Sequence, residues 1–147
     1  MEIEYTLTRK IRELANLITK NRDADIRELE LTTAQADILL YFAENPGKST
    51  VDLKSFLSVT HQTAQGIVQR MADKGLLKLS PSRNDARYKQ IFLTEKALTV
   101  YKSMLENGTH TGNQLLSGMS AEEKEQFLAL ITLGLKNLND MQVQRGE

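Results

Sequence analysis

The sequence predicts a mainly α-helical protein (α+β class) in which the β structure is a single hairpin. Three observations support this prediction. Apolar residues recur at helical spacing along most of the chain, strand-like alternation is confined to residues 77–93, and capping or breaking residues separate the segments. The expected element order is ααααββαα. At 147 residues, the chain is most simply one domain, residues 1–147, with enough length to bury a core.

Composition narrows the class of protein. The share of hydrophobic residues, 40%, and of charged residues, 26%, is typical of a soluble globular protein. No stretch approaches the ~18 apolar residues of a membrane span, and the N-terminus lacks the apolar core of a signal peptide. The absence of cysteine excludes disulfides, thiolate metal sites and thiol-based sensing. We therefore expect a cytoplasmic protein with no membrane partner.

The first predicted element is an amphipathic helix within residues 1–30. Its apolar positions are spaced by three or four residues and form a narrow seam, while charged residues fill the other face. A seam this narrow is easier to explain as packing against another helix than as the core of a small domain. We expect a weak point near residues 21–25. The seam consists of Ile3, Leu7, Ile11, Leu14 and Ile18.

Two capped helices are expected next. Thr32 and Gln35 form a capping-box pattern, and the breaker run at residues 45–47 ends the helix that they open. Ser49 is the N-cap candidate of a short helix that ends near residue 57. The positions expected to be buried are Ala36, Leu39, Leu40 and Ala43 in the first of these helices, and Leu53, Phe56 and Leu57 in the second.

Residues 60–74 predict a helix with two distinct faces. Thr60 is its N-cap candidate, and Gly75 follows its end, where positive φ is least costly for glycine. Glutamine can pair with N6 and N7 of adenine, and arginine with guanine or a phosphate, so a glutamine-rich face suits contact with DNA. With the short preceding helix and the tight link at residues 58–59, this segment predicts a helix-turn-helix. The apolar face carries Ala64, Ile67, Val68 and Met71, and the polar face carries Gln62, Gln65, Gly66, Gln69 and Arg70.

A β-hairpin with a basic tip is predicted after the helix-turn-helix. Residues 77–80 and 88–93 alternate as strands do, and a turn-rich segment separates them. The tip contains Arg83, Asn84, Asp85 and Arg87.

Two further helices are expected to complete the chain. The first starts at Thr94 and should bend or break between residues 107 and 113, where Gly108 and Gly112 dilute the helical pattern. The pattern Ser120-x-x-Glu123 is a capping box that opens the second. The apolar stripe of this last helix is Phe127, Leu130, Ile131, Leu135, Leu138 and Met141.

Charge is segregated along the chain although the formal net charge is zero. Residues 46–93 hold eight basic and three acidic side chains, and the remainder carries the compensating acidic excess. Nucleic-acid binding uses such a basic segment, while chance clustering of solvated charges explains the count alone equally well.

Residues 31–97 resemble the winged helix-turn-helix of MarR-type transcriptional regulators. The flanking helices fit the dimerisation region of that family, so the resemblance spans nearly the whole chain. It implies a winged helix-turn-helix with a two-stranded wing over residues 31–96, flanked by N- and C-terminal dimerisation helices over residues 1–30 and 97–147. The matching positions are Leu31-Thr32-x-x-Gln35, Thr63 and Ala64, Lys74-Gly75-Leu76, Asp85-x-Arg87 and Leu93-Thr94.

The resemblance also implies a function. It implies a homodimer that binds a palindromic promoter site in double-stranded DNA, usually as a repressor that a small ligand releases. The recognition helix is expected in the major groove, with Arg70 on a phosphate, and the wing at the adjacent minor groove or its phosphates. Asp85 is expected to orient Arg87 through a bidentate fork. The DNA-contacting candidates are Thr60, His61, Gln62, Thr63, Gln65, Gln69, Arg70, Arg83, Asp85 and Arg87.

Two positions depart from the family pattern. Gly66 stands where many relatives place an arginine on the groove-facing side, and Ala97 replaces a glycine that is common after the Leu-Thr pair. The first change predicts weaker binding or an A·T-leaning site, because it removes a base or phosphate contact.

A small aromatic or phenolic ligand is the expected effector. It would lie in a crevice between the dimerisation helices and the winged unit and favour a spacing that no longer matches DNA. The candidate lining residues are Leu14, Tyr41 and Tyr101, and each fits plain core packing equally well.

The main alternative is a winged-helix protein–protein interaction module without DNA binding. Gly66 favours this alternative, and Arg83 and Arg87 oppose it. An enzyme is not expected, because the sequence has no GxSxG, no Gly-rich phosphate loop, no HExxH and no cysteine nucleophile. No cofactor or metal is expected either, because His61 and His110 are far apart and have no partner at ligand spacing. His61 fits a base contact, a phosphate donor or a surface residue equally well.

Overall fold

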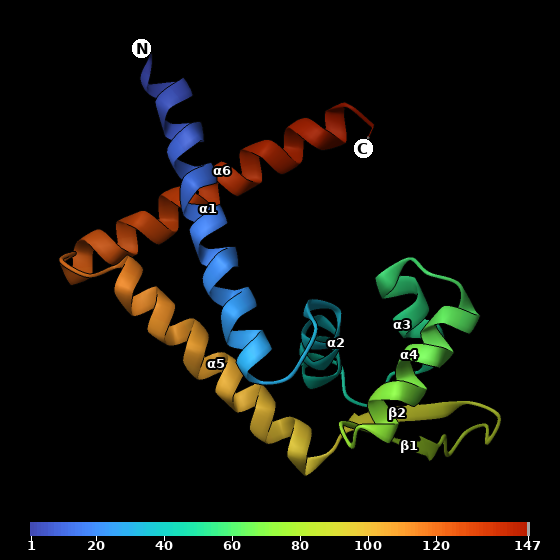
Figure 1. Ribbon diagram of the computed structural model, residues 1–147. Coiled ribbons are helices and arrows are strands. Elements are labelled where there is room, and N and C mark those ends of the chain that lie inside the picture. Colours follow the sequence, from blue (N-terminus) through green and yellow to red (C-terminus); the bar gives the residue numbers. More distant parts are fainter. Residues whose placement is uncertain (147) are drawn as a thin grey trace. The chain divides into compact units, whose positions relative to one another are not determined.

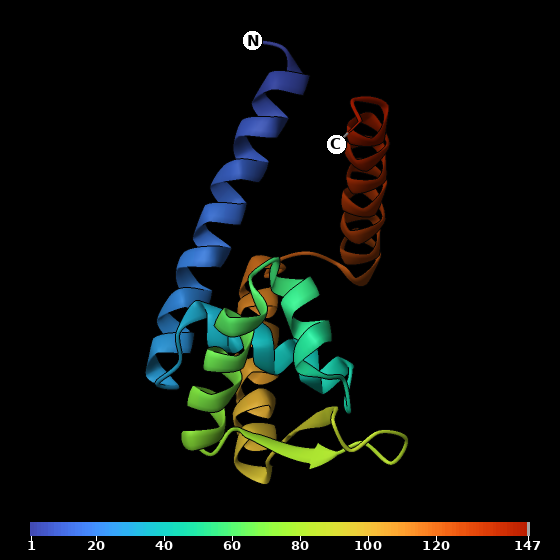
Figure 2. The same cartoon turned by 90° about the vertical axis from the view of Figure 1, so that its right-hand side faces the viewer.

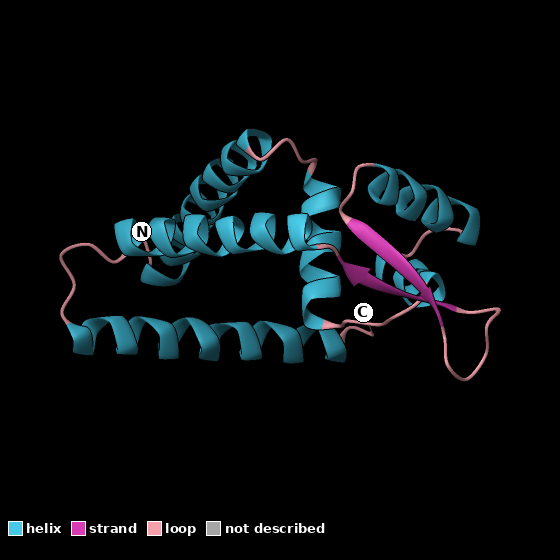
Figure 3. Cartoon of the chain, turned by 90° about the horizontal axis from the view of Figure 1, so that it is seen from below, coloured by secondary structure: helices cyan, strands magenta, loops and turns pink. Residues whose placement is uncertain are grey.

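The computed structural model describes residues 1–146, and this part of the chain forms helices and one β-hairpin (Figures 1 and 3). The predicted order ααααββαα is confirmed. Two compact units are present, residues 1–109 and residues 110–147, and each is described by itself. The elements are α1 (Ile3–Glu28), α2 (Thr33–Glu44), α3 (Thr50–Leu57), α4 (His61–Asp73), β1 (Leu77–Pro81), β2 (Lys89–Leu93), α5 (Glu95–Leu115) and α6 (Ala121–Gln144).

The core of the first unit is built around α2, which begins at the predicted capping box of Thr32 and Gln35. Ala36 and Leu39 are buried as expected, but Leu40 and Ala43 are only half-buried. Sequence periodicity missed Ile38 and Phe42, which are both fully buried. The physical reason is that α2 contacts both α1 and β2, so it is covered on more than one side and no single stripe describes it. The cluster is Ile26, Leu31, Ala36, Ile38, Leu39, Phe42, Leu53, Val68, Met71, Leu76, Leu77, Ile91, Leu93 and Ala97.

Helices α3 and α4 form the predicted helix-turn-helix. Ser49 caps α3 in a capping box with Asp52. The backbone N–H of Ser49 donates to the Asp52 carboxylate over 2.8 Å, and this hydrogen bond lowers the pKa of Asp52. Ser58 ends α3 in the left-handed conformation, with φ of 55°, and turns the chain sharply into α4. Thr60 caps α4 as expected, its hydroxyl accepting the N–H of Thr63 over 3.1 Å.

Four of the seven positions expected to be buried in α3 and α4 are buried, and Leu57 and Ile67 are half-buried. Ala64, Val68 and Met71 are buried, and Leu53 is fully buried. The expectation that Phe56 is buried is wrong, because its side chain is 51% exposed. Its ring instead stacks on Tyr41 of α2, with ring centroids 4.5 Å apart, at the surface beside the core.

The hairpin is antiparallel and pairs Leu77 with Leu93 and Leu79 with Ile91. It is tied to the end of α4 and to the start of α5. Gly75, at φ of +80°, makes the turn after α4, and its carbonyl accepts a 2.6 Å hydrogen bond from the Thr94 hydroxyl. The loop between the strands extends away from the helices of this unit (Figure 2). Because the hairpin is held at its base, beside the end of α4, its orientation follows that of α4.

The break expected between residues 107 and 113 is wrong, and the weak point expected near residues 21–25 does not interrupt α1. Helix α5 runs without a break through Gly108 and Gly112, and α1 is continuous through residues 21–25. Neither glycine adopts positive φ. A glycine inside a helix costs about 1 kcal/mol relative to alanine, which reduces helix stability without requiring a bend.

Long apolar side chains remain exposed on α1 of the first unit and on α6 of the second. Ile3 and Leu7 of the predicted seam are exposed, and so are Leu130, Leu135 and Leu138 of the predicted stripe. Within the second unit, Phe127 and Ile131 are half-buried. Helix α6 begins at the predicted capping box of Ser120 and Glu123. Among residues 1–146, none of the helices combines the length and the apolar character that crossing a membrane requires.

Candidate nucleic-acid interface

The polar face of α4 is at the surface of the first unit. Gln62, Gln65, Gln69 and Arg70 are exposed, and Gly66 between them is half-buried. These positions share a face because residues three and four apart lie side by side on a helix, while the buried stripe packs into the core. The apolar side of α4 is therefore packed in the core, and its polar side is exposed to solvent.

A groove of about 750 Å³ lies between this face, the start of α3 and the hairpin. It brings together His61, Gln62, Gln65, Gln69 and Arg87 of the predicted DNA-contacting residues. Thr60, Thr63, Arg70, Arg83 and Asp85 do not line it, although all ten predicted residues belong to α4, its cap or the hairpin loop. The described lining combines basic, neutral polar and apolar side chains and contains no acid, so the groove suits an anionic partner.

The groove also includes residues that the sequence analysis did not select. Lys89 and Tyr88 approach it from the start of β2, and Ser49, Thr50 and Val51 from the start of α3. Lys89 could have been found from the basic hairpin, since it lies two residues after Arg87. No local pattern indicates the α3 residues, because they reach the groove only through the packing of α3 on α4.

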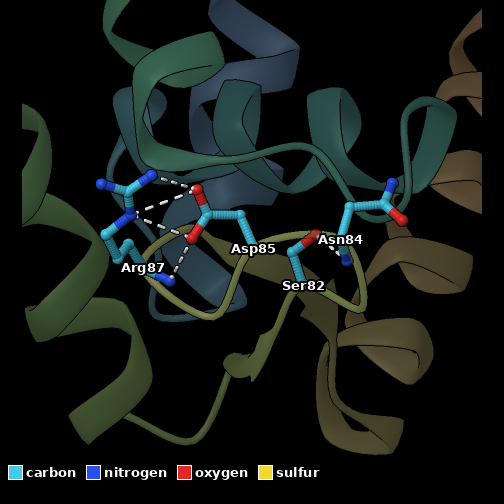
Figure 4. Close-up of polar contacts among 4 residues, drawn as sticks. All are labelled: Ser82, Asn84, Asp85 and Arg87. Carbon is cyan, nitrogen blue, oxygen red and sulfur yellow. Dashed lines mark hydrogen bonds and ion pairs between the residues drawn. The ribbon is translucent and has the colours of Figure 1, made fainter.

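The wing, defined as β1, β2 and the loop between them, carries a preformed ion pair (Figure 4). Nη2 of Arg87 lies 2.7 Å from Oδ2 of Asp85, and Nε lies 3.1 Å from Oδ1. The expected bidentate fork is therefore confirmed. The hydrogen bonds from Arg87 lower the pKa of Asp85, and the carboxylate in turn raises the pKa of Arg87.

The wing fork is fixed locally. The backbone N–H of Arg87 also donates to Oδ1 of Asp85 over 3.0 Å, and the N–H of Asn84 donates to the Ser82 hydroxyl over 3.3 Å. Both are short-range turn contacts, in which a side-chain oxygen accepts from a backbone two residues further on. The Arg87 side chain nevertheless remains 86% exposed, so it is oriented without being buried.

Gln69 and Thr63 of α4, and the cap residue Thr60, have hydrogen-bond partners within the chain. The Gln69 amide donates a 2.8 Å hydrogen bond to Oδ1 of Asp73, one turn further along. The Thr60 hydroxyl donates to the Thr63 hydroxyl over 2.9 Å while it caps the helix. Thr60 and Thr63 thus have a structural role at the start of α4 that does not depend on DNA.

The three candidate ligand-contacting residues lie on different helices. Leu14 of α1, Tyr41 of α2 and Tyr101 of α5 are half-buried, and none of them lines the groove. Tyr41 packs against the core, stacks on Phe56 and meets Phe42 edge to face. Burial, with the nearby charge of Asp52, raises the pKa of Tyr41.

The described residues contain no cluster suited to a metal ion. Within residues 1–146, no three His, Asp or Glu side chains are placed to bind one. His61 lines the groove at the first turn of α4, and His110 is exposed on α5.

Comparison with known proteins finds similar sequences and structures. Residues 29–87 match the model of the MarR family. The chain is also 29% identical over 132 residues to the uncharacterized HTH-type transcriptional regulator YybA of Bacillus subtilis (strain 168), covering 90% of this chain and 88% of that protein. The winged unit of this chain is therefore similar to the MarR family.

Solved structures of other proteins share this fold. A mutant of MepR from S. aureus bound to an oligodeoxyribonucleotide superposes with a TM-score of 0.73 at 23% identity, covering 90% of this chain and 97% of that one. The transcriptional regulator SlyA superposes with a TM-score of 0.66 at 25% identity, covering 91% and 94%. YybA and SlyA are transcriptional regulators, and this chain is similar to both.

Proposed function

We propose that this protein is a MarR-type regulator that binds double-stranded DNA as a homodimer and represses transcription from a palindromic promoter site. The observation that carries the proposal is the groove, where the glutamine face of α4 and the oriented Arg87 of the wing share one surface without an acidic residue in its described lining. The winged helix-turn-helix of residues 31–96 would be the DNA-binding region.

The fold supports a specific docking mode. Helix α4 is packed by its apolar stripe and exposes a face long enough to enter the major groove, where glutamine pairs with adenine edges. Arg87 would then reach the adjacent minor groove or its phosphates, with Arg83 at the same tip. The Arg87 guanidinium is always charged, and its hydrogen bonds to Asp85 orient it before DNA binds.

Pairing of two chains is proposed from the exposed apolar residues of α1 and α6. Residues 1–30 and 97–147 would form the dimerisation region, burying Ile3 and Leu7 of the seam and Leu135 and Leu138 of the stripe. A twofold dimer places two recognition helices about one turn of DNA apart, roughly 34 Å, which requires a palindromic site.

Release by a ligand is the remaining part of the proposal. A small aromatic or phenolic molecule near Leu14, Tyr41 and Tyr101 would favour a dimer whose two helices no longer match the spacing of the grooves. A panel of small aromatic acids, added to a footprint on the DNA flanking the gene, tests this step. The cytoplasmic location expected from the sequence stays a prediction.

A salt titration tests the central claim. Binding of generic duplex DNA is measured by fluorescence anisotropy at low and high salt. A DNA-binding protein loses affinity steeply, because each neutralised phosphate releases counterions. Little affinity at either salt would contradict the proposal and leave a protein–protein module as the better account. The DNA-bound MepR structure supports the first outcome.

A further inference from the structure

The centre of the polar face of α4 combines a glycine with an arginine one turn later. Nη1 of Arg70 lies 3.5 Å from the point that a Cβ on Gly66 would occupy. A helical side chain leans toward the N-terminus and covers the turn before its own Cα, so Arg70 is expected to extend over residue 66. Any side chain larger than alanine at position 66 would take the space that the guanidinium uses.

Nothing within the described part of the chain holds this guanidinium elsewhere. The ion pairs within residues 1–146 join Arg22 to Asp37, Arg87 to Asp85 and Lys136 to Asp140, and none involves Arg70. The nearest glutamine toward the end of α4, Gln69, turns its amide to Asp73. Arg70 therefore lies over Gly66 with its donors free.

We propose that Arg70, laid across Gly66, reads a guanine in each half-site, so that Gly66 is a specificity-determining residue. This inference rests on the proposed DNA binding. Gly66 lies between Gln62, Gln65 and Gln69 at helical spacing, which places the guanidinium among side chains suited to adenine. The planar fork of arginine matches O6 and N7 of guanine. The preferred half-site then contains one essential guanine among A·T pairs.

The test uses the full-length protein and sites selected from random duplex DNA. Each guanine of the selected site is replaced singly by 7-deazaguanine, which lacks the N7 acceptor. For the wild-type protein, one position per half-site should weaken binding about tenfold, since a hydrogen bond to a charged group is lost. Arg70→Ala should bind more weakly and show no further loss on this replacement.

Two substitutions at position 66 test whether the Arg70 guanidinium must lie over residue 66, with Arg70 itself unchanged. In Gly66→Ala, the added Cβ meets Nη1 at an ordinary contact distance, so the 7-deazaguanine effect should persist whatever the overall affinity. In Gly66→Leu, the longer side chain occupies the guanidinium position and the effect should vanish while Arg70 is still present. Leucine and alanine both favour a helix over glycine, so thermal melting should exclude unfolding as the cause. Arg145→Ala, which removes an arginine at the end of α6, is the control and should leave the effect intact.

Each result decides the matter. A selected site without guanine, or wild-type binding that no 7-deazaguanine changes, overturns the inference while leaving DNA binding intact. An equal loss for Arg70→Ala on every sequence, with the 7-deazaguanine effect unchanged, makes Arg70 a phosphate contact and also overturns it. Absence of any DNA affinity in low salt removes the proposed function itself.

Discussion

Single side chains in the wing combine local order with exposure. Asp85 and Arg87 are two residues apart, and their fork needs only a tight turn, so it could be predicted from the sequence. The lowered pKa of Asp85 means that the fork is present above the ordinary pKa of the carboxyl and is lost as the pH falls through the lower value in the folded protein. Near neutral pH, the arginine is therefore held in one direction.

Replacing Arg87 tests the contribution of the wing. Arg87→Ala should weaken binding on all DNA sequences and reduce the slope of log affinity against log salt by about one, because one phosphate contact is lost. Anisotropy titrations over a range of salt concentrations measure the slope. Arg145→Ala removes the same charge outside the groove and should keep the wild-type slope. An unchanged slope for Arg87→Ala would remove the wing from the DNA footprint.

Ser58 carries backbone strain in the turn of the helix-turn-helix. Its φ of 55° is costly for a residue with a Cβ. Ser58→Gly should raise the free energy of unfolding by about 0.5–1 kcal/mol, after allowance for the greater freedom of glycine in the unfolded chain. Urea denaturation measures the change. Ser55→Gly, inside α3, is the matched control and should destabilise the protein; stabilisation by both substitutions would show that φ is not the cause.

At the scale of elements, caps were predictable and burial was less so. Thr32, Ser49, Thr60 and Ser120 each cap the helix that follows, because capping depends on residues within one turn. The burial of Phe42 and the exposure of Phe56 were not predicted, since they depend on which elements pack against α2 and α3. The same holds for the groove. Its α4 residues follow from helical spacing, whereas its α3 residues follow only from packing.

The two phenylalanines provide a direct comparison. Phe42 is 1% exposed and Phe56 is 51% exposed. Phe42→Ala should lower the free energy of unfolding by about 3–5 kcal/mol, because it removes buried surface and leaves a cavity. Phe56→Ala should cost much less, limited to the stacking contact with Tyr41. Urea denaturation of both variants measures the difference, and equal losses would contradict the burial of α2 described above.

For the whole molecule, charge and apolar surface are distributed unequally along the chain. The basic segment of residues 46–93 contains α3, α4 and the wing, while exposed leucines occur on α6. Exposed apolar patches of this kind are typical of protein interaction sites. The fold and the resemblance to the MarR family could be predicted from the sequence, because local patterns follow one another in the expected order. The partner of the exposed leucines could not, because a single chain does not contain it.

Pairing can be tested at one of these leucines. Light scattering at micromolar concentration should show a dimer. Leu135, which is 60% exposed, tolerates a charge within the single chain, so Leu135→Glu should shift the protein toward monomer and weaken DNA binding together. Lys124→Glu, also on α6, is the control and should remain dimeric. A monomeric wild-type protein at this concentration would contradict the proposal that two recognition helices bind successive major grooves.

If the exposed leucines pair two chains, DNA occupancy depends steeply on the amount of protein in the cell. If only the dimer binds the operator tightly, occupancy of the operator at low expression rises with roughly the square of the number of chains. Halving synthesis would then leave about a quarter of the paired form. A promoter controlled by such a dimer would respond more sharply to small changes in protein concentration than one controlled by a regulator that binds as a monomer.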